Sequence, residues 1–174
     1  MKATGVVRRI DELGRIVIPK EIRRTLKIKE GTPLEIYSGD DGELLLKKYS
    51  PVLEISSVAG EVAQSIADGT KYCVLVTNME KVIAASGKDK TKYINRPIDS
   101  QIDKLIKARQ SQIVSLFDAN SLLFDIDIKN FVISPILTEG DVYGSIIIFG
   151  DLSMGETERL LAKSFSNYLA KQIG

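Results

Sequence analysis

Five arginines near the amino end are the residues of this sequence best suited to chemistry with another molecule. A guanidinium group donates two parallel hydrogen bonds, so it can grip a phosphate or the edge of a guanine base. The first 29 residues hold nine basic side chains against three acidic ones, which gives this segment a net charge of +6. Such a concentration of positive charge is typical of a surface that neutralises phosphates. The five arginines are Arg8, Arg9, Arg15, Arg23 and Arg24.

Two other interpretations of these basic residues stay open. The whole chain of 174 residues has a formal net charge of +1, so its overall charge argues neither for nor against a nucleic-acid partner. A basic segment can also be a solvated face that keeps the protein in solution. One of Arg23 and Arg24 can instead pair with the carboxylate of Glu21 or Asp11.

The composition excludes most catalytic and metal sites. The chain has no histidine and only one cysteine, Cys73. It therefore cannot form a Ser-His-Asp triad, a Cys-His pair, a histidine metal site, an internal disulfide or an iron–sulfur cluster. No apolar run approaches the roughly 18 residues of a membrane span, and the amino end lacks a signal-peptide core. We expect a cytoplasmic protein that is not an enzyme and has no metal, no cofactor and no membrane partner.

Two local patterns look like known sites but fail on their spacing. Ser86–Thr91 contains Gly-Lys, yet a phosphate-binding P-loop needs a glycine where Val82 stands. Asp125–Asp127 begins like a calcium loop, yet Asn130 and Ile136 occupy the positions of its glycine and its last acid. We therefore interpret Ser86–Thr91 as a polar loop and reject the calcium loop.

The other reactive side chains are interpreted as structural. Cys73 lies in an apolar run, where a buried and inert thiol is expected. Asp118, Asp125 and Asp127 are candidates for a Mg²⁺ site or for paired carboxylates, but neither a base nor a phosphate-binding loop accompanies them. We expect these acids to be solvated loop residues.

The first module, residues 1–50, is predicted to be mainly β. Its expected elements are a strand over Thr4–Ile10, a turn ending at Gly14, a strand over Ile16–Ile18, a helix over Lys20–Leu26 that Gly31 stops, and a hairpin of Leu34–Tyr37 with Glu43–Lys48. So few short strands cannot bury much apolar surface, and nothing staples them. The economical solution is an obligate homodimer with one shared core, whose two-fold symmetry presents the arginines twice, as duplex DNA requires.

The second module, residues 51–174, is predicted to be α+β. Ser50 and Pro51 mark its start, and a helix over 51–69 that ends at Gly69 links it to the first module. Further along we expect strands over Tyr72–Thr77 and Lys81–Ala85, a helix over 98–110, weaker strands over Ile113–Phe117 and Leu122–Ile126, strands over Phe131–Leu137 and Val142–Phe149, and a helix over 154–173 capped by Ser153 and Glu156. This order favours a mainly antiparallel sheet with helices packed against it.

The segment Gly5–Leu26 closely resembles the N-terminal DNA-binding domain of the AbrB-like transition-state regulator family. The resemblance continues through Gly31, Leu34–Tyr37 and Leu45–Tyr49, so it covers essentially the first module. It implies a swapped-hairpin dimer, in which hairpins from two chains interleave into one body. It also implies that DNA is contacted by Arg8, Arg15, Arg23 and Arg24, with Arg9 as a basic neighbour.

A second resemblance concerns the carboxyl-terminal module. Ser134–Phe149 looks like the closing hairpin of a GAF domain, and the order of strands and helices agrees. The Asn-Lys-…-Phe pattern of cyclic-nucleotide-binding GAF domains is missing, as is a surface cysteine placed for a bilin chromophore, so the ligand is unknown. The two modules in this order resemble the transcription regulators of spore-forming bacteria, which implies a homotetramer associated through the second modules and control of spore-development genes.

The sequence thus predicts a DNA-binding transcription regulator of sporulation genes, an activator or a repressor. Its N-terminal homodimer binds double-stranded DNA, and its GAF-like domain oligomerises and senses an unidentified small ligand. Two alternatives remain. One is an antitoxin-like DNA-binding protein, which the strand and helix periodicity of residues 51–174 disfavours, and the other is a ligand-sensing module that does not bind DNA.

Overall fold

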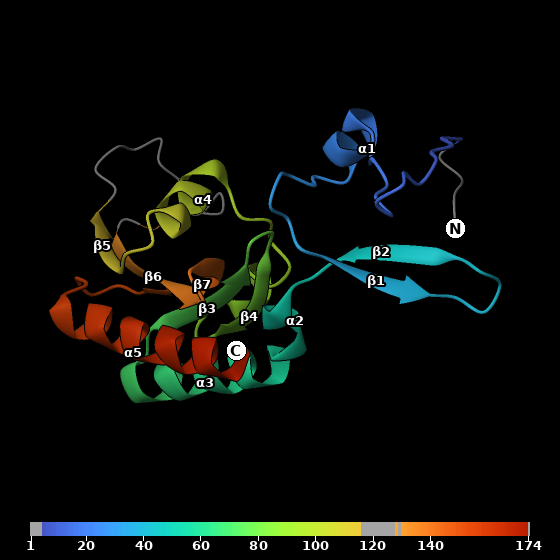
Figure 1. The fold of residues 1–174 in the computed structure, drawn as a ribbon. Helices are drawn as coiled ribbons and strands as arrows, with labels where there is room; N and C mark the ends of the chain where they lie inside the picture. The colour runs from blue at the N-terminus through green and yellow to red at the C-terminus, as the bar shows by residue number, and fades with distance from the viewer. Residues whose placement is uncertain (1–4, 116–127, 129, 174) are drawn as a thin grey trace. The chain divides into compact units, whose positions relative to one another are not determined.

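The computed structural model describes residues 5–115, 128 and 130–173 of the chain. It divides into two compact units, Met1–Tyr49 and Ser50–Gly174 (Figure 1). The first unit has a short helix and one two-stranded sheet, whereas the second has a five-stranded sheet with helices. In the described part of the chain, no helix combines the length and the apolar character that a bilayer crossing needs.

The first unit contains helix α1 (Lys20–Thr25) and a hairpin of strands β1 (Leu34–Ser38) and β2 (Leu44–Lys48). The antiparallel strands are in register from Leu34 opposite Lys48 to Ser38 opposite Leu44. Their connection closes with the Gly39 N–H donating to the Glu43 carbonyl at 2.8 Å. The hairpin predicted from the sequence is therefore confirmed.

Two segments of this unit that were predicted to be strands are not strands in the structure. Residues 5–10 and 16–18 lie outside any described strand, because a strand needs paired backbone groups and these segments pair with no strand of their own chain. The predicted stop of the first helix at Gly31 is also wrong. The chain leaves the helix at Leu26, and Lys27 takes a left-handed conformation with φ of 53°.

The first unit has no buried residue among those described from 5 to 49. Large apolar side chains lie on its surface, and Val7 is 85% and Val17 is 71% exposed. The exposed set comprises Val6, Val7, Ile10, Leu13, Ile16, Val17, Leu26, Ile36, Leu44, Leu45 and Leu46. A single copy of this unit therefore leaves its apolar residues in water, as the sequence predicts.

The second unit is a five-stranded antiparallel sheet with strand order β4-β3-β7-β6-β5. Its strands are β3 (Cys73–Asn78), β4 (Val82–Ser86), β5 (Gln112–Ser115), β6 (Asn130–Thr138) and β7 (Asp141–Phe149). Its helices are α2 (Pro51–Glu54), α3 (Ser56–Thr70), the 3-10 turn η1 (Lys90–Lys92), α4 (Ser100–Lys107) and α5 (Glu156–Ile173). The antiparallel sheet predicted from the sequence is confirmed.

Helices cover both faces of this sheet. Helices α3 and α5 lie side by side on one face, and α4 covers the other (Figure 1). Each residue of β3 is buried, with Val74 and Val76 packed toward α3 and α5, and Leu75 packed in the cluster of α4. A strand covered on both faces has to be apolar at successive positions, which explains the continuous apolar run in the sequence.

Three details of the second unit differ from the predictions. The helix over 51–69 is two helices, α2 and α3, with a break at Ile55. Helix α3 continues past Gly69 to Thr70 and is capped by Lys71, which has a φ of 64°. The predicted capping box of Ser153 and Glu156 is wrong: Glu156 pairs with Arg159, and the start of α5 is capped by the Glu158 carboxylate, which accepts from the Gly155 N–H at 2.8 Å. The predicted strand Leu122–Ile126 lies outside the described residues, as do Asp118, Asp125 and Asp127.

A close backbone approach between β3 and β7 generates a testable prediction. A Cβ on Gly144 would stand 1.9 Å from the Thr77 carbonyl oxygen, and backbone cannot move aside cheaply. We expect Gly144→Ala to lower the free energy of unfolding of the second unit by about 3 kcal/mol, measured by chemical denaturation of the full chain. As a control, Gly69→Ala in α3 meets no atom within 4 Å and should stabilise by about 0.5–1 kcal/mol. Equal effects of the two variants would contradict this account.

Candidate nucleic-acid interface

A tight turn positions Arg15. The Asp11 carboxylate oxygen Oδ1 accepts from the backbone N–H groups of Leu13 and Arg15 at 3.0 and 2.8 Å. The Asp11 N–H donates to the Arg15 carbonyl at 3.0 Å, and Gly14 supplies the positive φ of 74° that the turn requires. Asp11 thus closes the turn from both its backbone and its side chain.

The same aspartate holds the guanidinium of Arg15. The second carboxylate oxygen, Oδ2, accepts from Arg15 Nε at 2.8 Å, while the Arg15 side chain stays 70% exposed. Hydrogen bonds from the Arg15 backbone N–H and then from its side chain lower the pKa of Asp11 below the ordinary 3.8. Since the ion pair is made through Nε, Arg15 is oriented and keeps its two terminal nitrogens to offer to an acceptor.

Arg23 and Arg24 lie in the last turn of α1. Pro19 precedes the helix, and its carbonyl accepts from the Arg23 N–H at 3.0 Å. The Arg23 side chain folds back, with Nε donating to the Ile18 carbonyl at 3.2 Å. Asp11 pairs with Arg15, so the interpretation in which Asp11 neutralises Arg23 or Arg24 is wrong.

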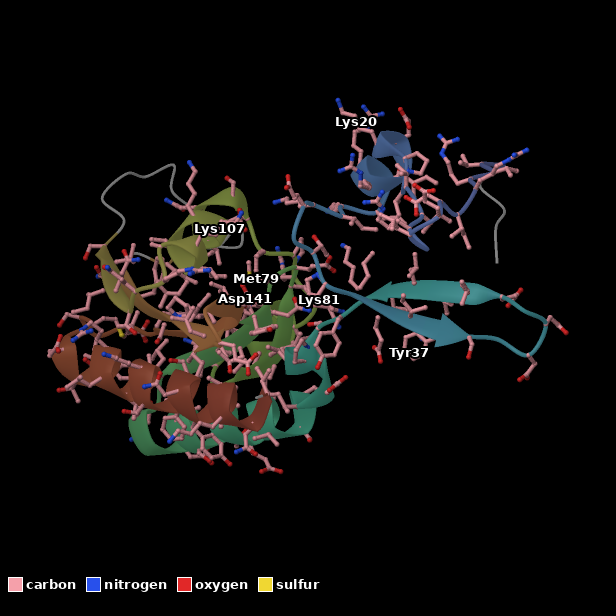
Figure 2. The ribbon with its side chains drawn as sticks, viewed as in Figure 1. Lys20, Tyr37, Met79, Lys81, Lys107 and Asp141 are labelled. Carbon is pink, nitrogen blue, oxygen red and sulfur yellow. The ribbon has the colours of Figure 1, made fainter. Side chains whose placement is uncertain are left out.

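All five arginines predicted as site residues are exposed. Arg8 and Arg9 precede the Asp11 turn, Arg15 closes it, and the other two follow on α1. Lys20 adds a further cation at the start of α1, where its side chain projects away from the helix (Figure 2). The sequence analysis predicted the turn and named Asp11, but it did not identify Arg15 as the partner of Asp11, although an aspartate that closes a turn of this kind lies within reach of the residue after its glycine.

The exposed arginines of the first unit suit recognition of anions. Within residues 5–115, 128 and 130–173, no three His, Cys, Asp or Glu side chains gather as a group that could hold a metal ion. Cys73 is buried, and burial, followed by the charge of Asp89, raises the pKa of its thiol to about 12. The thiol is therefore protonated and inert near neutral pH, as the sequence predicts.

One chain thus joins a unit with exposed arginines to a separate α+β unit, an arrangement that fits a transcription regulator. Residues 54–174 match the family described as "Stage V sporulation protein T C-terminal, transcription factor". The chain is also 43% identical over 178 residues to stage V sporulation protein T of Bacillus subtilis (strain 168), across 99% of both chains. The chain belongs to the stage V sporulation protein T family of transcription factors and is not an enzyme.

The first unit has relatives of its own. Residues 7–54 match the family described as "Antidote-toxin recognition MazE, bacterial antitoxin". Over 63 residues, 36% of this chain and 64% of the relative, the identity to the transition state regulatory protein AbrB of Bacillus subtilis (strain 168) is 57%. The AbrB-like character predicted from the arginine-rich segment is confirmed.

Solved structures show the fold of the second unit. The second GAF domain of DevS from Mycobacterium smegmatis matches with a TM-score of 0.52 and 14% identity, across 67% of this chain and 90% of that one. A GAF domain region of a membrane protein from Geobacter sulfurreducens PCA matches with a TM-score of 0.55 and 17% identity, across 71% and 95%. The predicted GAF-like fold is confirmed, and identities this low carry nothing about a ligand.

The Asp11–Arg15 pair gives a prediction with a defined pH dependence. A carboxylate with a lowered pKa keeps its ion pair above 3.8 and loses it as the pH falls through the lowered value. We therefore expect the NMR signal of the Arg15 Nε–H to hold its position above pH 3.8 and to shift at lower pH. In Asp11→Asn this titration should vanish, and the Arg24 Nε–H serves as the internal control. An Arg15 signal that titrates alike in both proteins would refute the pairing.

Proposed function

We propose that the first unit binds double-stranded DNA through Arg8, Arg9, Arg15, Arg23 and Arg24. The observation that carries this proposal is the exposed guanidinium of Arg15, which Asp11 orients on a closed turn. An oriented arginine loses less side-chain freedom on binding a phosphate than a free one does. The 57% identity to AbrB over this segment supports the same assignment.

The DNA-binding form is proposed to be a homodimer through residues 1–50. The apolar side chains exposed on one copy need cover, and a second copy offers a surface of the same chemistry. Interleaved hairpins from two chains would bury both sets at once. Two-fold symmetry would then present each arginine twice along the duplex.

The second unit is proposed to join two such dimers into a homotetramer and to sense a small ligand. On α5, Leu160 is 50% and Tyr168 is 45% exposed, which leaves apolar surface for a helix of another copy. Ligand binding would act by changing how the two DNA-binding dimers are oriented. A regulator that acts on DNA in this way is expected in the cytoplasm.

The antitoxin-like alternative rests on the MazE match of residues 7–54. An antitoxin of this kind wraps its toxin with an extended tail, whereas residues 50–174 form a unit with its own apolar core. Resistance of that half to protease without any partner would argue against the antitoxin role, and rapid digestion would favour it. The other alternative, ligand sensing without DNA binding, predicts no gel shift of any duplex.

Salt dependence tests the role of Arg15 in DNA binding. If Arg15 neutralises one phosphate per subunit, Arg15→Ala removes about two contacts from a dimer. The slope of log K against log salt should then fall by about 1.8, measured by fluorescence anisotropy with duplex DNA. Lys104→Ala, on the exposed surface of α4 in the second unit, is the matched control and should leave the slope unchanged. An unchanged slope in Arg15→Ala would show that Arg15 does not contact a DNA phosphate.

If Arg23 reads bases instead, its loss should relax sequence preference by about 1–3 kcal/mol per contact.

The two proposed interfaces can be separated by oligomeric state. Val17→Asp places a charge on the exposed apolar surface of the first unit, and Tyr168→Asp places one on α5. We expect sedimentation velocity to show a tetramer for the parent chain, a dimer for each variant and a monomer for the pair. Only Val17→Asp should also abolish DNA binding. A parent chain that sediments as a monomer would contradict both interfaces.

A further inference from the structure

A pocket of about 410 Å³ opens in the second unit, and no sequence motif marks it. Its floor consists of side chains that are buried by the fold: Cys73, Tyr93, Ile128 and Phe149. Its rim carries charged residues from three different segments of the chain. A volume of this size is within the range of small-molecule sites.

Two glycines bring the segments of the rim together. A Cβ on Gly87 would stand 2.6 Å from the Tyr72 carbonyl oxygen and 2.8 Å from Cys73 Cα, so the loop after β4 lies directly against the start of β3. A Cβ on Gly150 would stand 2.7 Å from the ring of Tyr72, so the end of β7 approaches the same segment. These approaches place Lys88 and Asp151, the residues that follow the glycines, on one rim.

The rim carries two charges of each sign. The residues that line the pocket include two lysines, Lys71 and Lys88, and two aspartates, Asp89 and Asp151. The Asp89 carboxylate is also 3.1 Å from the ammonium of Lys92 outside the pocket. An anion alone would meet the two carboxylates at this rim, and a cation alone would meet the two lysines, so a ligand with both charges is the best match.

The floor is uncharged. Its thiol has a pKa raised to about 12 by burial, and burial likewise raises the pKa of Tyr93. The rings of Tyr93 and Phe149 meet edge to face, with centroids 5.3 Å apart, and fix this wall. Such a floor favours an apolar group of the ligand, because a third charge would lose its water without a partner.

We propose that this pocket binds a free α-amino acid with an apolar side chain. The carboxylate of the ligand pairs with Lys71 and Lys88, its ammonium group pairs with Asp151 and Asp89, and its side chain lies on the floor. This inference rests on the proposed sensory role of the second unit and gives it a site and a ligand class.

The class of ligand is tested by calorimetry on the full chain. The probes are L-leucine, L-isoleucine, L-methionine and L-phenylalanine, together with 4-methylpentanoate and 3-methylbutylamine, which lack the ammonium and the carboxylate of leucine respectively. We expect saturable binding of at least one amino acid, with the one-charge analogues bound at least tenfold more weakly than leucine when leucine binds. Absence of binding by all four amino acids, or equal binding of either analogue, would overturn the proposal.

The location of the site is tested with variants and with the cysteine. Lys88→Gln and Asp151→Asn change exposed side chains and should each weaken binding at least tenfold, while Lys104→Gln on α4 should not. Cys73 is the single cysteine of the chain and lies on the floor, so a bound amino acid should shift the NMR signals of Cys73 and leave those of Tyr168 on α5 in place. Binding without a shift at Cys73, or binding unchanged in both pocket variants, would place the ligand elsewhere and overturn the assignment.

A parallel gel shift on duplex DNA distinguishes failure of the pocket assignment from failure of the DNA-binding role. Retained DNA binding with no amino-acid binding refutes the pocket assignment and leaves the DNA-binding role intact. Amino-acid binding at the pocket with no gel shift refutes the DNA-binding role and leaves the pocket assignment intact.

Discussion

The first unit depends on an unmet need for apolar burial. Fully burying a valine or leucine side chain stabilises a fold by about 1.5–3 kcal/mol, yet no described residue from 5 to 49 is buried. A two-stranded hairpin and a six-residue helix are not stable on their own in water. The proposed homodimer supplies the missing cover, and its two-fold axis is also what would align arginines from two chains with duplex DNA. In this proposal, the association that completes the fold of the first unit also forms the DNA-binding surface.

The second unit solves the same problem within one chain. Helices α3 and α5 cover one face of its sheet, and α4 covers the other, so strand β3 is buried along its whole length. At the edge of the sheet, a pocket is lined by residues that include lysines and aspartates. The two units therefore differ: the first leaves apolar side chains exposed, whereas the second buries its own core and, as proposed, binds a small molecule.

Both proposed sites are preorganised by the folded chain. The Asp11 carboxylate accepts hydrogen bonds from the backbone of its own turn and from Arg15, which orients the exposed guanidinium in the absence of any ligand. In the pocket, the glycine approaches at Gly87 and Gly150 similarly fix the backbone beneath Lys88 and Asp151. In both places the cost of ordering is met by the folded chain, so less of the binding energy is lost when the ligand binds.

Local sequence determined the parts whose signals are local. The apolar runs gave β3, β6 and β7, the amphipathic stripe gave α5, and the arginine-rich segment identified the AbrB-like unit. Tertiary structure decided the rest. Residues 5–10 and 16–18 are not strands, because strand formation needs a neighbouring strand that no local pattern supplies. Asp11 pairs with Arg15 because the turn between them brings their side chains together. The pocket exists only where Gly87 and Gly150 let segments distant in sequence touch, and such contacts depend on packing geometry that residue types alone do not specify.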